Sequence, residues 1–380
     1  MVAFNLPEES TSRISIRGVD GSLWKIHGAD AYNSPVQIEK GSLGDIFDAP
    51  VATSRKARVG QPGMVYRGHR YMERHIALNV TMQADHPDDR FRIDSDFRQA
   101  FSYEEPAELI VDTDLSGERS LQVRLSEHPT IRGDYDPVMG RVSQITFPLV
   151  ADDPFFSSTT VTDEFTFTGM NWYGGGVYVS NPGDVPIWPK WVLTAPAKFI
   201  LPDVSFRDDA EKARQVVLPF QPLKRTVLVD TDPGEEMIVA NDDALLWAQM
   251  GGQFFNNPIP PHTPRTFVPV SVDPLPNLPW VIPDSMRRWI AQQIAAWAKT
   301  LGAEQMLTTT PDQLAAKIKQ FINDVTPDWV EDLNPDLLKE LVPSLIAGAI
   351  RDQWGSIGNM AGATAQVRLE RRWSRPWGME

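Results

Sequence analysis

Residues Val142–Phe156 read VSQITFPLVADDPFF, and this stretch marks the end of the first domain of the chain. It predicts a strand that stops abruptly at Asp153-Pro154, because proline cannot donate to a strand ladder and aspartate favours turns. A second marker follows at Asn181-Pro182-Gly183-Asp184, and the next strand is predicted at Trp191–Leu193. The chain is therefore expected to pass from one strand-rich domain to another between these markers.

The composition describes a folded protein built from short segments. The chain has 380 residues, enough for two or three domains, of which 42% are hydrophobic and 23% charged. Its 32 prolines and 25 glycines punctuate short elements, as is typical of β-sandwiches and barrels. The absence of cysteine excludes disulfides, thiolate metal sites and a cysteine nucleophile.

Charge and hydropathy argue against several kinds of target. The net charge of −14 disfavours a phosphate-binding surface and adsorption to anionic lipid. Residues Met1–Ser12 carry Glu8 and Glu9 and no apolar core, so we expect no signal peptide. The longest apolar run, Leu341–Ile350, is well short of the roughly 18 residues that a membrane span requires. We therefore expect no association with a membrane.

Periodicity predicts a strand-rich first domain with one helix. Residues 13–28 alternate in polarity around Asp20-Gly21 and predict a hairpin. Residues 41–68 show little periodicity and are expected to form a long loop or an extended arm. Residues 90–101 predict one amphipathic helix. The other strands of this domain are predicted at Tyr71–Gln83, Glu108–Asp112, Leu121–Leu125 and Arg141–Leu149.

After Pro154 the pattern is all strand until it turns helical. Between about Asp284 and Ile350 apolar residues recur at helical spacing, and Thr-Pro or Asn-Pro pairs stand at the predicted helix starts. A strand returns at Ala365–Leu369, so we expect the helical block to be an insertion. The strands before it are predicted around Phe165–Phe167, Val177–Val179, Trp191–Leu193, Val216–Leu218, Thr226–Asp230 and Phe267–Val270.

Four phrases, in this order, resemble those of a known family. They are I-x-I-x-G-x-D-G-S-x-W at 14–24, ADDPFF at 151–156, N-P-G-D-x-P at 181–186 and R-x-W-x-x-P-W-G at 371–378. Together they resemble the phage distal tail proteins, the siphovirus tail components or minor tail proteins, and are similar to those of actinobacterial phages. The resemblance covers residues 13–272 and 360–380.

The resemblance implies a mainly β fold with a helical insertion. Residues 1–157 would form a β-rich, ring-forming N-terminal domain with one helix. Residues 158–272 and 360–380 would form a galectin-like β-sandwich. Residues 273–359 would be an α-helical insertion between the last two strands of that sandwich.

The resemblance also implies an architectural function. Proteins of this family form a ring, here expected to hold six copies, at the distal end of a long non-contractile tail, where it serves as a baseplate hub of the virion. The implied partners are other copies of the chain, the tail tube protein, tail tip, tail-associated or fibre proteins, and the tape measure protein. DNA would pass through the lumen without specific binding, and assembly would take place in the host cytoplasm.

Two other functions compete with this one. The galectin-like fold implied for the second domain makes a carbohydrate-binding module that recognises the host cell wall the alternative. A tail hydrolase is the third hypothesis, and it is disfavoured because the sequence has no nucleophile elbow, metal motif or paired His and acid.

The residues that could carry chemistry form no recognised motif. None of the histidines belongs to an H-E-x-x-H pair, and the paired acids are typical of turns. We therefore expect no catalytic, cofactor-binding or metal-binding residue, no cofactor and no enzyme activity. The histidines are His27, His69, His75, His86, His128 and His262, and the acidic groups are Asp85–Asp89, Asp152-Asp153, Asp208-Asp209 and Asp242-Asp243.

Aromatic and basic residues leave two interpretations open. Gly174–Gly176 follows Trp172-Tyr173 and predicts a strand-linking loop, with sugar binding as the other interpretation. The tryptophans next to prolines could stack on sugars, but core packing and subunit contacts explain them more simply. The basic run near the end of the chain is expected to pair with an acidic neighbouring subunit. These residues are Trp188, Trp191, Trp373 and Trp377, and Arg368, Arg371, Arg372 and Arg375.

Overall fold

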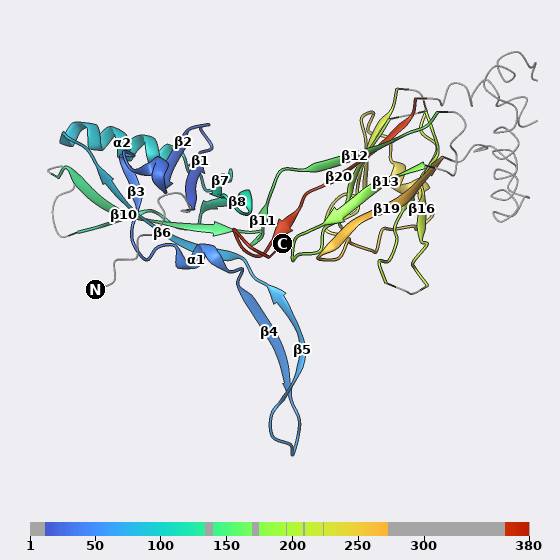
Figure 1. The fold of residues 1–380 in the computed structure, drawn as a ribbon, viewed down its shortest axis with the longest axis horizontal. Helices are drawn as coiled ribbons and strands as arrows, with labels where there is room; N and C mark the ends of the chain where they lie inside the picture. Colours follow the sequence, from blue (N-terminus) through green and yellow to red (C-terminus); the bar gives the residue numbers. More distant parts are fainter. Residues whose placement is uncertain are drawn as a thin grey trace, which may run out of the picture. The chain divides into compact units, whose positions relative to one another are not determined.

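The computed structural model describes residues 12–133, 140–168, 175–194, 196–207, 210–222, 224–272 and 362–379. The chain forms two compact units. Unit 1 contains Met1–Thr160, Pro182–Pro186 and Glu370–Glu380, and unit 2 contains Val161–Asn181 and Ile187–Leu369. Both are built mainly from strands, which confirms the fold class expected from the sequence (Figure 1).

Unit 1 is a ten-stranded antiparallel sheet that curls into an almost closed barrel. Its main path runs β2-β1-β7-β8-β10-β6-β3, and the edge strands β2 and β3 approach each other. The short strands β9, β11 and β21 pair alongside this path. The strands are β1 (Arg13–Arg17), β2 (Leu23–His27), β3 (Val36–Ile38), β6 (Arg74–Gln83), β7 (Ala107–Thr113), β8 (Gly117–Leu125), β9 (Thr130–Arg132), β10 (Val142–Ala151), β11 (Phe156–Ser157) and β21 (Arg372–Trp373).

The core of unit 1 follows from alternation along its long strands. Every second side chain of β6 and of β10 is buried, as a strand with one buried face requires. The buried side chains include Ile76, Leu78 and Val80 on β6, and Ile145, Phe147 and Leu149 on β10. Helix α2 (Pro87–Gln99) closes the barrel with Phe97, whose ring meets those of its neighbours edge to face. Two further helical turns among the described residues of unit 1 are η1 (Ala29–Ala31) and α1 (Gly44–Phe47).

A two-stranded hairpin leaves the barrel between α1 and β6 (Figure 1). It consists of β4 (Val51–Ala57) and β5 (Met64–Tyr71), paired from Val51↔Tyr71 to Ala57↔Met64. We call residues 51–71 the hairpin arm. Here the expectation of a loop or arm over 41–68 was incomplete, because the stretch contains α1 and two regular strands.

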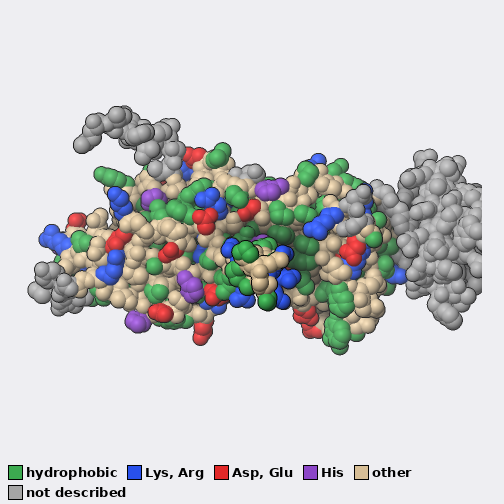
Figure 2. All heavy atoms as spheres, turned by 90° about the horizontal axis from the view of Figure 1, so that it is seen from below, with side chains coloured by type: hydrophobic (Ala, Val, Ile, Leu, Met, Phe, Trp, Pro, Cys, Tyr) green, Lys and Arg blue, Asp and Glu red, His purple; other side chains and the backbone are tan. Residues whose placement is uncertain are grey.

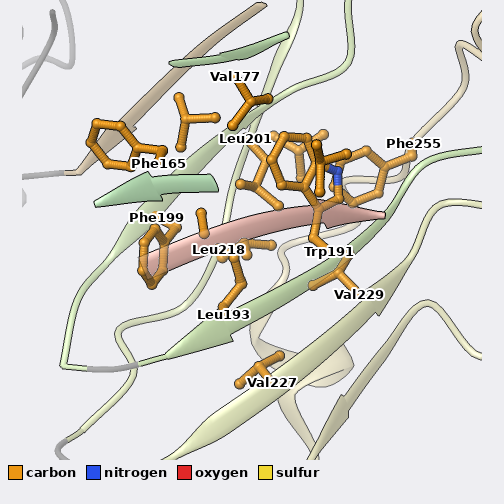
Figure 3. Packing of buried hydrophobic residues seen from close by; sticks show 14 of the residues in the cluster. Phe165, Val177, Trp191, Leu193, Phe199, Leu201, Leu218, Val227, Val229 and Phe255 are labelled. Atoms are coloured by element: carbon orange, nitrogen blue, oxygen red, sulfur yellow. The ribbon is translucent and has the colours of Figure 1, made fainter. Parts of the chain in front are cut away.

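Unit 2 is a sandwich of two antiparallel sheets. One sheet has the order β12-β20-β14-β17-β18 and the other β13-β19-β15-β16. Their inner faces enclose a single hydrophobic cluster that includes Phe165, Trp191, Phe199 and Val229 (Figure 3). The elements are β12 (Val161–Thr166), β13 (Gly175–Asn181), β14 (Lys190–Thr194), β15 (Phe199–Pro202), β16 (Gln215–Val217), β17 (Thr226–Asp230), β18 (Ile238–Ala240), β19 (Thr263–Val272), β20 (Thr364–Leu369) and the turn η3 (Leu246–Gln249).

The domain limits expected from the sequence need one correction. Residues 360–380 do not all join the sandwich: β20 does, whereas Glu370–Glu380 belong to unit 1, where β21 pairs with β11. The two strands that flank the predicted helical insertion lie in opposite sheets, β19 in one and β20 in the other. The insertion itself, 273–359, lies outside the described residues, and no helix among the described residues is long and apolar enough to cross a membrane.

Candidate functional site

The centre of the candidate site is Arg74, the first residue of β6. Its side chain is fully buried, because it occupies the same face of the strand as Ile76, Leu78 and Val80. Its guanidinium donates to three backbone carbonyls from distant parts of the chain. Nη1 reaches the oxygen of Ile46 at 2.6 Å, Nε and Nη2 reach that of Pro154 at 3.1 and 2.7 Å, and Nη2 reaches that of Ser374 at 3.0 Å.

The charge on Arg74 is held by dipoles and a ring rather than by a hydrogen-bonded carboxylate. Burial lowers the pKa of its guanidinium to about 10, against the opposing influence of the Asp48 charge, so the group remains protonated at neutral pH. The ring of Phe156 lies 5.2 Å from the guanidinium carbon and adds a cation–π contact. Because a buried charge without partners is very costly, the three carbonyls and Arg74 fix one another in place.

The segment around Ser374 is the most distant of these partners. Its β21 pairs with β11 through Phe156↔Trp373 and Ser157↔Arg372. The amide of Ser374 donates to Oδ1 of Asp184 at 2.9 Å, and its hydroxyl donates to the other carboxylate oxygen. Asp184 is the acid of the N-P-G-D turn, so this turn and the R-x-W-x-x-P-W-G ending contact each other directly.

A second buried arginine, Arg119 of β8, anchors the same segment further along. Its Nη1 donates to the carbonyl oxygens of Arg375 and Gly378, each at 3.0 Å. Its guanidinium carbon stands 4.1 Å from the centre of the Trp373 ring, which is 5% exposed. We call Arg74, Arg119 and the segments 153–156, 182–186 and 372–378 the arginine clasp, all of which lie in unit 1.

The arginine clasp brings together three of the four phrases on which the family resemblance was based. ADDPFF contributes the Pro154 carbonyl and the Phe156 ring, N-P-G-D contributes Asp184, and the ending contributes Trp373 and Ser374. Neither Arg74 nor Arg119 was among the candidate residues identified from the sequence. A signal was present, because Arg74 shares the period of two with the apolar residues of β6.

The hairpin arm is rooted in the arginine clasp. The ring of Tyr71, at its base, meets that of Phe155 edge to face at 4.7 Å, and the amide of Met72 donates to the carbonyl of Pro50 at 2.9 Å. Burial, with a smaller contribution from the Asp184 charge, raises the pKa of Tyr71. Beyond this base, all but two of the arm's residues are exposed, Val65 and Gly68 being intermediate.

The basic residues expected to pair with a neighbouring subunit are partly used within the chain. Arg372 forms an ion pair with Asp153, and Nε of Arg375 lies 2.9 Å from a carboxylate oxygen of Asp48. Nε of Arg368 donates to the side chain of Gln366 at 2.9 Å. A larger basic concentration, not expected from the sequence, lies on the hairpin arm, where Arg55, Lys56, Arg58, Arg67 and Arg70 occur without any acid.

The other singled-out residues serve the fold in most cases. Trp191 is buried in the sandwich core and Trp373 in unit 1, and Trp377 stacks edge to face on Phe47 at 4.8 Å. Gly175 and Gly176 begin β13, where a side chain would collide with Phe165 or Phe267, whereas Gly174 lies outside the described residues. Trp188 is half-buried.

The histidines do not converge on a common site. His69 lies on β5 and His75 on β6, and the two strands are separated by a break at Met72-Glu73. Within the described ranges no group of three or more His, Asp or Glu side chains is arranged to hold a metal ion. Among the predicted acidic pairs, Asp242 accepts from Arg225 at 2.6 Å, and this hydrogen bond lowers the pKa of its carboxyl.

Comparison with known proteins finds relatives that match about two thirds of the chain. No protein-family model matches it. The chain is 28% identical over 304 residues to the minor tail protein Gp27 of Mycobacterium phage L5, a match that covers 66% of this chain and 88% of the relative. It is also 28% identical over 309 residues to Gp27 of Mycobacterium phage D29, covering 67% of this chain and 90% of that protein.

Solved structures give more distant likenesses. The SPP1 Dit protein, described as a hub of the adsorption apparatus, superposes with a TM-score of 0.46 at 13% identity, over 69% of this chain and 94% of its own. A chain of the phage P2 baseplate superposes with a TM-score of 0.40 at 13% identity, over 69% of this chain and 97% of the baseplate chain. The sequence relatives confirm the resemblance drawn from the four phrases: this chain is related to the minor tail proteins of mycobacterial phages.

Proposed function

We propose that the protein is a structural component of a phage tail, placed at the distal end of a long non-contractile tail in the virion. The observation that carries this proposal is the match to two minor tail proteins, which runs along nearly the whole of those relatives. In this role the chain forms a closed ring, of six copies, that joins the tail tube to tip or fibre proteins as a hub. Such a role requires no catalysis.

The architecture supports assembly into a closed ring. Within the part of the chain that the structure describes, the sandwich of unit 2 and the hairpin arm both leave strand edges open, and cyclic assembly is a common way to cover such edges. Six copies would carry a formal charge of about −84, so we expect a neutral to acidic lumen that lets DNA slide without adhering.

Electron microscopy of the purified chain tests this proposal. We expect rings with a central hole, and light scattering should give the mass of about six chains. Labelled antibodies should bind at the distal tip of intact virions. Monomers at every concentration, together with absence of the chain from the virion tip, would exclude the proposed role.

Carbohydrate binding is the second candidate, and one surface of unit 2 favours it. Tyr178 and Phe267 are 43% and 49% exposed on neighbouring strands, with ring centres 5.5 Å apart. Phe267 also borders an open depression of about 790 Å³ that contains Arg207, Lys212 and His262. Binding of host wall glycans by the full chain, lost in Phe267→Ala, would support this function, and an unchanged glycan array would exclude it.

A further inference from the structure

The hairpin arm is a surface that no other part of the described chain covers. Val51, Met64 and Tyr66 are 49%, 61% and 56% exposed, and Val59 at the tip is fully exposed. Among the described residues its strands β4 and β5 pair only with each other, so each has an open edge there. A two-stranded hairpin on its own is marginally stable in water, and exposed edges invite pairing with another chain. The arm therefore has the features of an element that is completed by a partner.

The arm has an aromatic face. Residues paired across the strands share a face, and the register places Tyr66, His69 and Tyr71 together with Met64 on one side. Tyr66 and His69 are three residues apart, so in a regular strand their side chains would point to opposite faces. A bulge in the pairing at Ser54/Arg55 shifts the register and brings both side chains to the same face. The Tyr66 hydroxyl lies 2.6 Å from Nδ1 of His69, and the His69 ring meets that of Tyr71 at 5.7 Å. This row of rings continues into the arginine clasp through Phe155.

The arm is also cationic in an acidic protein. It carries Arg55, Lys56, Arg58, Arg67 and Arg70 and no Asp or Glu. Without these five, the chain has 31 Lys and Arg against 50 Asp and Glu, a net charge of −19. Figure 2 looks along the arm from below and shows Lys and Arg gathered around apolar side chains near the centre of the view.

Unlike many other exposed cations of unit 1, the arm's cations have no acidic partner among the described residues. Within the described residues none of the five forms an ion pair, and their one side-chain hydrogen bond joins Arg58 to Gln61 at 3.4 Å. Elsewhere in the unit, cations such as Arg13, Arg98 and Arg132 pair with carboxylates. The arm thus presents unpaired positive charge and exposed rings on the same ribbon.

We propose that the hairpin arm binds a second copy of this chain and lies on the acidic surface of that second copy. The cations would pair with carboxylates of the neighbour, and Tyr66 and Met64 would be buried against it. The negative charge of the rest of the chain supplies the complement, and a ring repeats the same contact in every copy. The apolar face favours protein over nucleic acid as the occupant, since phosphates would leave Val51 and Met64 uncovered. This proposal rests on the proposed ring and names the element that closes it.

Charge reversal tests the proposal. The variant Arg55→Glu/Lys56→Glu/Arg67→Glu should raise the dissociation constant of self-association by roughly tenfold or more, because like charges then face each other. The matched control is Lys40→Glu/Arg141→Glu/Lys224→Glu, which changes the net charge equally at exposed positions outside the arm. Analytical ultracentrifugation of the full chain should show weakened assembly for the arm variant alone. Wild-type assembly should weaken in about 1 M salt, where the screening length falls to roughly 3 Å.

Cross-linking identifies the occupant directly and does not depend on a multiple variant. Because the chain has no cysteine, Val59→Cys can carry a single photo-reactive label at the arm tip. In a mixture of isotope-labelled and unlabelled chains, we expect cross-links between copies, and few from Leu115→Cys, which is 90% exposed on the β7–β8 turn.

The outcomes separate this proposal from the proposed function. If wild type forms rings and the arm variant assembles as the control does, the arm is not the contact, although the ring stands. If wild type forms no assembly at any concentration, the arm contact fails, and the tail role is then decided by whether the chain is found at the virion tip. If the arm variant keeps its rings but loses retardation of duplex DNA in a gel, the arm is a nucleic-acid contact and the proposal is overturned.

Discussion

The guanidinium of Arg74 donates a hydrogen bond to the carbonyl of Ser374, a residue 300 positions further along the chain, at 3.0 Å. The same guanidinium binds Pro154, where the first domain ends in sequence, and Ile46, just before the hairpin arm. One buried side chain therefore fixes the start of β6, the end of the barrel and the returning segment. Stability of unit 1 is expected to depend on it more than on any surface charge.

Replacing Arg74 by Met should destabilise unit 1 by about 3–5 kcal/mol, because the substitution leaves buried carbonyl oxygens without donors. Calorimetry should show a fall of roughly 10 °C in the unfolding midpoint of that unit. The control is Arg92→Met, whose side chain is 79% exposed beside Asp89 and should change stability by less than about 0.5 kcal/mol. Equal losses of stability in the two variants would show that the hydrogen bonds of Arg74 do not stabilise unit 1 more than a surface ion pair does.

Gly175→Ala should destabilise unit 2. A Cβ at this position would lie 1.8 Å from Cε2 of Phe165, whose ring is part of the sandwich core. Such overpacking costs about 1–3 kcal/mol, and chemical denaturation should register it as an earlier midpoint. Gly44→Ala is the matched control, because no atom lies within 4 Å of the added methyl group. An unchanged midpoint for Gly175→Ala would mean that Phe165 moves aside without loss.

The pH dependence of stability should include a contribution from His27. Burial lowers the pKa of its imidazole from 6.5, so the unfolded chain binds a proton at a higher pH than the folded one. Stability from this group is therefore complete above about pH 6.5 and falls as the pH drops below it. In His27→Gln the unfolding midpoint should change less than in the wild type when the pH falls from about 7 to about 5. His128→Gln, at an exposed position, should keep the wild-type slope, and an identical slope in both would contradict the assignment.

Replacing residues 275–358 by a short Gly-Ser linker should leave unit 2 folded. The sequence predicts this helical block to be an insertion, and the strands on either side of it, β19 and β20, already have partners in their own sheets. We expect circular dichroism to show loss of helix only, with rings still present in electron micrographs. A chain that no longer folds would show that the block is part of the core.

Much of the fold was readable from the sequence, for a physical reason that applies to each element. β6, β10 and β17 have one face against a core, so burial imposes alternation on their residues, and their predicted limits agree with the structure within a few positions. The hairpin arm was missed as a pair of strands because neither of its faces is buried, and without burial there is no alternation to read. The four phrases indicated the relationship to minor tail proteins, and each of them lies at a local turn or strand end.

Sequence alone thus determined the strand-rich class, the change of domain near Pro154 and the relationship to phage tail proteins. Only the tertiary structure decided that residues 370–379 return to unit 1 rather than completing the sandwich. That choice depends on Arg74 and Arg119, which bind backbone carbonyls more than 250 residues away. A carbonyl oxygen is present in every residue, so the sequence of the bound segment carries no mark of the contact. Geometry alone selects which carbonyls a buried arginine will bind.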